Sequence, residues 1–67
     1  MFIQYGIRRI NLATIKEYSP KNNEGNYIIE LIFVDNKKEN LNFFSDKEKR
    51  DEFLCKLDNT YNGSSIL

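Results

Sequence analysis

The clearest pattern in the chain is a run of apolar residues from 27 to 34 that fills both faces of an expected strand. One face would carry Tyr27, Ile29, Leu31 and Phe33. The other face would carry Ile28, Glu30, Ile32 and Val34. Apolar side chains on both faces are typical of a central strand that is covered on each side. We therefore predict a central strand over residues 27–34.

A second strand is expected over residues 39–44, after a polar turn at 35–38. Leu41 and Phe43 alternate with Asn40 and Asn42. A two-residue loop would set Leu41 and Phe43 opposite Ile32 and Glu30, and a three-residue loop would set them opposite Phe33 and Leu31. A shift of one residue exchanges the two faces of a strand. We predict the three-residue loop, because it places both asparagines on the face that bears Glu30.

An amphipathic helix is expected to begin after Ser45 and to run to about Tyr61. Ser45 and Glu48 have the spacing of a capping box, in which each side chain accepts a backbone N–H of the other. The apolar residues then recur at helical spacing, at Phe53, Leu54, Leu57 and Tyr61. Gly63 follows as a stop signal. We predict one domain over residues 1–62 and a disordered tail over 63–67.

The N-terminal third is expected to add further strands, which would either extend the sheet or fold over the face that carries Ile28, Ile32 and Val34. Residues 2–7 mix apolar and polar side chains, and Gly6 is typical of a bulge. Residues 10–12 continue the alternation, and residues 13–18 fit a further strand or, equally, a short helical turn over 13–16. Residues 19–26 are rich in turn formers and predict a loop that closes a wide hairpin.

These elements predict an α+β fold, with an antiparallel sheet of three to five strands and one C-terminal helix packed on one face. The segment Tyr27–Leu57, with its Ser45-Asp46-Lys47-Glu48 cap, Arg50-Asp51 pair and Phe53-Leu54, resembles the last strands and closing helix of pleckstrin-homology-like domains. Small bacterial and phage proteins with an Ile-Asn-Leu segment, here 10–12, are similar as well. The length and element order also resemble the dimeric transcriptional-coactivator fold, which implies binding of single-stranded DNA.

The composition narrows the function more than the strand pattern does. The chain has ten basic and ten acidic residues, no histidine and one cysteine, Cys55. An intrachain disulfide is therefore impossible, a metal or cofactor is not expected, and no nucleophile has a histidine base to activate it. We predict a non-enzymatic protein. No signal segment or run of membrane-spanning length is visible, so we expect a cytoplasmic protein without membrane contact.

Two groups of residues are candidates for an interaction site. Ile28, Ile32 and Val34 would form an apolar face that one helix cannot cover, and such a patch typically marks an interaction surface. We therefore expect a homodimer or a protein partner, and an accessory role in a phage or other mobile element. The alternative is single-stranded nucleic-acid binding through Arg8 and Arg9, because residues 1–22 carry a net charge of +3. The net charge of zero favours the first hypothesis.

Overall fold

The computed structural model describes residues 1–62, which form five strands in two antiparallel sheets and one C-terminal helix. The elements in chain order are β1 (Phe2–Tyr5), β2 (Arg8–Asn11), the 3₁₀ helix η1 (Leu12–Thr14), β3 (Ile15–Asn23), β4 (Asn26–Phe33), β5 (Lys38–Asn42) and α1 (Lys47–Asn62). The predicted α+β class with one C-terminal helix is confirmed. The strands divide into a β1–β2 hairpin and a β3–β4–β5 sheet. The predicted tail lies outside the described residues.

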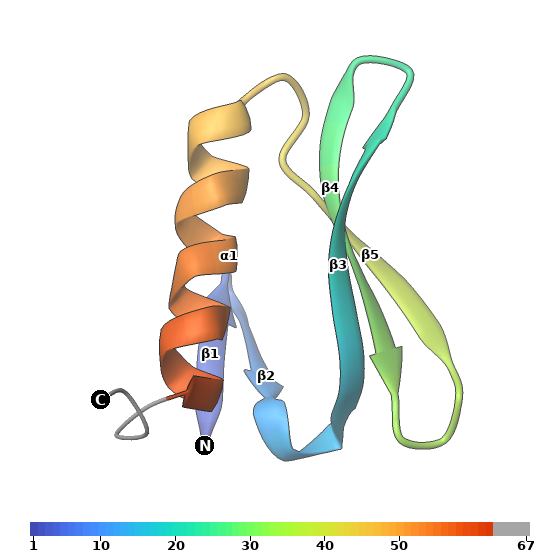
Figure 1. Cartoon of the computed structure of the whole chain (residues 1–67), viewed down its shortest axis with the longest axis vertical. Coiled ribbons are helices and arrows are strands. Elements are labelled where there is room, and N and C mark those ends of the chain that lie inside the picture. Colours follow the sequence, from blue (N-terminus) through green and yellow to red (C-terminus); the bar gives the residue numbers. More distant parts are fainter. Residues whose placement is uncertain (63–67) are drawn as a thin grey trace.

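The core lies between one face of the three-stranded sheet, helix α1 and the β1–β2 hairpin (Figure 1). Strand β4 is central, as its two apolar faces predicted. Eight buried residues form the core: Ile10, Leu12, Ile15, Ile29, Leu31, Leu41, Phe53 and Leu57. Each buried side chain of this size contributes roughly 1.5–3 kcal/mol of transfer free energy. The predicted helical stripe supplies Phe53 and Leu57, which are buried, and Leu54, which is half-buried.

The predicted wide loop over residues 19–26 is wrong, because β3 continues to Asn23 and pairs with β4 down to Asn26. Only Glu24 and Gly25 make the turn, with φ of 51° and 83°. Two successive positive φ values are the signature of a type I′ turn, whose twist matches that of the flanking strands. Pro20 is tolerated in β3 because it pairs with Ile29 on an edge strand. The backbone N–H and C=O of Tyr27 form hydrogen bonds with the chain at the end of β5. Alternate residues of a strand bond to the same side, so the backbone of Ile29 also faces β5, and the missing N–H of Pro20 leaves no ladder hydrogen bond unmade.

The faces of the β4–β5 pair were predicted correctly, but the register was not. Leu41 pairs with Ile29 rather than with Phe33, and Asn40 lies opposite Glu30. The chain turns earlier than expected, since the backbone N–H of Phe33 donates to the carbonyl of Lys37. The register differs from the predicted one by four positions, and an even displacement leaves every side chain on its predicted face.

The capping residue of α1 is Asp46, not Ser45 as predicted. The Asp46 Oδ1 atom accepts the backbone N–H of Lys49 at 3.0 Å, and the helix begins at Lys47. The backbone N–H of Asp46 donates to the carbonyl of Phe43, in a turn that gives Phe44 a φ of 55°. This turn moves the start of the helix one residue further along the chain than the sequence pattern suggested.

The strand predicted over residues 2–7 ends at Tyr5, since Gly6 lies in the turn of a hairpin and not in a bulge. Tyr5 pairs with Arg8, and Gly6 has a φ of 62°. The short helical turn, which the sequence allowed as an alternative over residues 13–16, is present and begins one residue earlier, over Leu12–Thr14. Strand β3 follows it directly. Asn11 caps this turn, because its Oδ1 accepts the backbone N–H of Ala13 at 3.0 Å.

Candidate interaction surface

The three predicted apolar residues lie in three different environments. Ile28 is only 7% exposed, Ile32 is half-buried, and Val34 is 61% exposed beyond the end of β4. Glu30 lies between Ile28 and Ile32, and its carboxylate is 2.9 Å from the Nζ of Lys21. The hydrogen bond from Lys21 holds the pKa of Glu30 below its usual value. This face of the sheet is therefore mixed in polarity, and Val34 is the exposed member of the set.

Arg8 and Arg9 point to opposite sides of strand β2. Arg8 makes a two-point contact with the carboxylate of Glu39 on β5, which raises the pKa of Arg8 and lowers that of Glu39. Arg9 is exposed and pairs across the hairpin with Gln4. Successive residues of a strand face opposite sides, so the two arginines cannot act as one basic patch. Arg8 holds the hairpin against the sheet, and Arg9 faces solvent.

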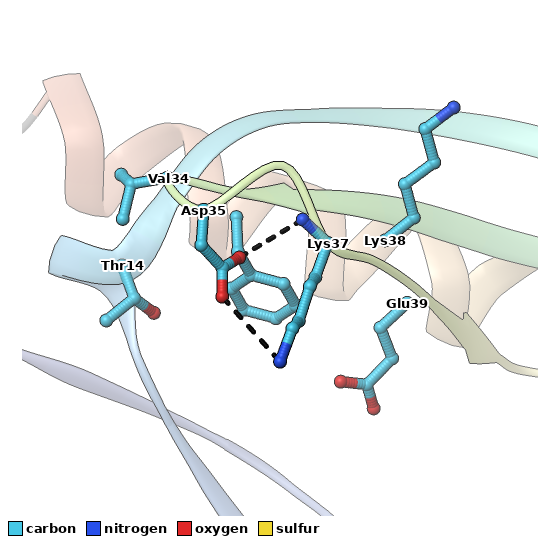
Figure 2. A pocket seen from close by; sticks show the side chains of 7 residues that line it. Thr14, Val34, Asp35, Lys37, Lys38 and Glu39 are labelled. Carbon is cyan, nitrogen blue, oxygen red and sulfur yellow. Dashed lines mark hydrogen bonds and ion pairs between the residues drawn. The ribbon is translucent and has the colours of Figure 1, made fainter.

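Val34 lies in an open groove of about 510 Å³ at the β4–β5 turn, which we call the turn groove (Figure 2). The groove is lined by Thr14, Phe33, Val34, Asp35, Lys37, Lys38 and Glu39. Thr14 comes from the end of η1, and its carbonyl accepts the backbone N–H of Val34 at 2.8 Å. That hydrogen bond joins two segments that are twenty residues apart in the chain. It places Thr14 beside the β4–β5 turn, so that Thr14 lines one side of the groove.

The charged residues of the turn groove are of both signs. Oδ1 of Asp35 accepts the backbone N–H of Lys37 at 3.1 Å, and its Oδ2 lies 4.0 Å from the Nζ of the same residue. Lys38 and Glu39 extend to opposite sides of β5 (Figure 2). Lys38 forms no ion pair with any other residue in the range 1–62. The apolar centre is thus surrounded by two lysines and two carboxylates.

The turn that carries the groove is held in place by side chains. Lys16 donates from its Nζ to Oδ1 of Asn36 at 2.6 Å, and Asn36 has a φ of 69°. Asparagine tolerates this left-handed conformation better than most residues, which suits it to the position. The sequence had marked 35–38 as a turn, but the contact with Thr14 and Lys16 depends on tertiary structure.

A second hollow, of about 240 Å³, lies where the β1–β2 turn meets α1, and we call it the hairpin hollow. It is lined by Gln4, Tyr5, Gly6, Phe43, Lys49, Glu52, Phe53 and Lys56. None of these residues was a predicted site residue. The segments that form it are separated by more than thirty residues in the chain, so no local pattern could reveal it.

Within residues 1–62, no group of three or more Cys, Asp or Glu side chains is arranged to hold a metal ion. Cys55 is exposed, and Nδ2 of Asn59 lies 3.6 Å from its sulfur. Over the same residues, no helix is long and apolar enough to cross a membrane.

Comparisons with protein-family models, with curated proteins and with solved structures gave no match. The resemblances to pleckstrin-homology-like domains and to the coactivator fold therefore remain predictions.

Proposed function

We propose that the protein is a non-enzymatic interaction module that associates with a second copy of itself through the turn groove. The observation that carries the proposal is the exposure of Val34, which is 61% accessible beside Phe33 in an open groove. An exposed apolar side chain in a concave, partly apolar surface gains free energy when a partner covers it.

The charges around Val34 favour a second copy as the partner. In a dimer with two-fold symmetry the same patch meets itself, so the patch must be complementary to itself. The turn groove carries Lys37 and Lys38 together with Asp35 and Glu39. Rotation about a two-fold axis can bring the lysines of one copy to the carboxylates of the other. A patch of one sign would repel its own copy.

The turn groove has only seven lining residues, which indicates a weak association. Stable interfaces involve about 20–30 residues on each partner, and smaller contacts belong to transient complexes. Exposed ion pairs add only about 0–1 kcal/mol each. The main contribution would come from covering Val34 and the exposed part of Phe33. A cytoplasmic location and an accessory role in a phage or mobile element belong to the same proposal.

Sedimentation velocity over a range of roughly 5–500 µM tests the proposal, because self-association depends on concentration. We expect the wild-type protein to shift from monomer towards dimer as concentration rises. Val34→Asp should stay monomeric, since it places a charge in the covered centre.

Phe44→Asp is the matched control. Phe44 is 66% exposed and follows β5 at the end opposite to the turn groove, so this variant should associate like the wild type. Circular dichroism would check that both variants are folded. A wild-type protein that remains monomeric at every concentration contradicts the proposal, and so does equal loss of association in both variants.

A further inference from the structure

The hairpin hollow is bounded by an aromatic cluster. The ring centroids of Tyr5 and Phe43 are 5.5 Å apart, those of Tyr5 and Phe53 are 5.9 Å apart, and those of Phe43 and Phe53 are 5.5 Å apart. Tyr5 and Phe43 are only half-buried, so their rings remain partly accessible. Accessible aromatic rings are surfaces on which a planar group can stack.

Polar groups of α1 and β1 surround these rings. Lys49 and Lys56 are two helical turns apart and therefore lie on the same side of α1, with Glu52 between them. Neither lysine forms an ion pair with another residue in the described part of the chain. Gln4 donates from Nε2 to the carbonyl of Gly6 at 3.0 Å, which leaves its side-chain oxygen free to accept.

Gln4 also belongs to the other face of the β1–β2 hairpin, opposite to the face that carries Tyr5, and the chemistry there is related. Gln4 lies opposite Arg9, and Phe2 lies opposite Asn11, so Phe2 and Arg9 are diagonal neighbours on one face. Phe2 is 63% exposed. Arg9 forms no ion pair with any other residue in the range 1–62. The first sixteen residues contain no aspartate or glutamate, so no carboxylate of the hairpin opposes an anion there.

We infer that single-stranded nucleic acid binds across strand β1, from the hairpin hollow to the Phe2–Arg9 face on the other side of the hairpin, with Gln4 common to both. Bases would stack on Phe2 and on the accessible rings of the hollow, and phosphates would meet Arg9, Lys49 and Lys56. Sequence-tolerant binding of single strands combines these two features, stacking on aromatic side chains and contact of phosphates with cations. Arg9 lies on β2, whereas Lys49 and Lys56 lie on α1. Because these cations are on separate elements, they suit several phosphates along one strand better than the phosphate of one free nucleotide. The partner and the surface both differ from those of the turn groove.

Fluorescence anisotropy with a labelled oligothymidylate of about 12 nucleotides tests the inference at low salt, roughly 20 mM, where phosphate contacts are strongest. We expect saturable binding whose logarithmic affinity falls with the logarithm of the salt concentration at a slope of about −2, from three phosphate contacts on a single strand. Phe2→Ala should weaken binding about fivefold or more, because it removes a stacking surface. The Lys49→Ala, Lys56→Ala double variant and Arg9→Ala should each weaken binding and make the slope shallower.

Lys47→Ala and Lys37→Ala serve as controls, since each removes an exposed lysine outside the hairpin hollow. Both should bind like the wild type, and so should Val34→Asp. Absence of binding at low salt overturns the inference, as does equal weakening by the control variants. Thymidine monophosphate that binds as tightly as the oligonucleotide, or a duplex of equal length that does so, would also overturn it.

Discussion

At the scale of single residues, backbone conformation shows where the chain is strained. Among residues 1–62, three residues other than glycine have positive φ: Glu24, Asn36 and Phe44. Glu24 lies in a turn that requires this conformation, and Asn36 tolerates it. Phe44 has neither a turn type that requires a positive φ nor a side chain that tolerates it, and the residue is 66% exposed. Its position is imposed by the path from β5 into α1, where its carbonyl accepts the backbone N–H of Tyr27 at 2.7 Å.

Phe44→Asn should therefore raise the free energy of unfolding by about 0.5–1 kcal/mol, because asparagine adopts the left-handed region at lower cost. Phe44→Val is the matched comparison and should lower it by a similar amount, since β-branched residues are strained most at positive φ. Urea unfolding at one protein concentration measures both. The explanation fails if asparagine does not stabilise the protein relative to valine.

At the scale of elements, the β1–β2 hairpin joins the rest of the fold without sharing a ladder with the larger sheet. Ile10 of the hairpin belongs to the common core. Two polar side chains of the hairpin, Tyr5 and Arg8, form hydrogen bonds with the edge strand β5. The hydroxyl of Tyr5 donates to the carbonyl of Asn42 at 2.8 Å and accepts the backbone N–H of the same residue at 3.0 Å. Arg8 bonds Glu39 further along that strand. These side chains cover an edge that would otherwise expose unpaired backbone groups.

Tyr5→Phe should lower the free energy of unfolding by about 1–2 kcal/mol, because it leaves two partly buried backbone groups of Asn42 without a partner. It should also speed hydrogen exchange at the amide of Asn42. Tyr27→Phe is the control, because the Tyr27 hydroxyl makes no hydrogen bond within residues 1–62 and the ring under Arg50 is kept. Equal effects of the two substitutions would show that the hydroxyl of Tyr5 is not the cause.

At the scale of the whole molecule, the end of α1 is bound to the first half of the chain by two tyrosines. The Tyr18 hydroxyl donates to Asp58 at 2.7 Å, and its ring stacks on Tyr61 with centroids 5.5 Å apart. The Tyr61 hydroxyl donates to the carbonyl of Leu12 at 2.6 Å. Burial and the hydrogen bond to Asp58 raise the pKa of Tyr18 to about 12. These contacts hold the C-terminal end of α1 against β3 and η1.

The folded protein should consequently lose stability in alkali. The folded pKa of Tyr18 lies above its ordinary value of 10.0, so the contribution of this group is complete below pH 10 and disappears as pH rises towards 12. Urea unfolding across that window should show a decline that is smaller in Tyr18→Phe, which cannot ionise. Tyr27→Phe should retain the wild-type decline. An unchanged decline in Tyr18→Phe would exclude this tyrosine as its source.

The sequence by itself determined the elements whose pattern is local. The central position of β4 followed from two apolar faces, and the helix stripe followed from the spacing of Phe53 and Leu57. The faces of β5 followed from the alternation of Leu41 with its asparagines. Strand alternation also predicts that Arg8 and Arg9 diverge, once residues 8–11 are known to be a strand. These features depend on neighbouring residues alone.

Tertiary structure decided everything that depends on distant segments meeting. Pro20 is a turn former locally, yet it lies in a strand because its position needs no ladder hydrogen bond. Val34 was a candidate from the sequence, but the groove around it exists only because the Val34 amide reaches the carbonyl of Thr14. Ile28 was a candidate too, and it is buried. The packing of the whole core decides which faces of the strands and the helix meet. The free energy of that packing depends on residues far apart in the chain, so a local pattern does not reveal it.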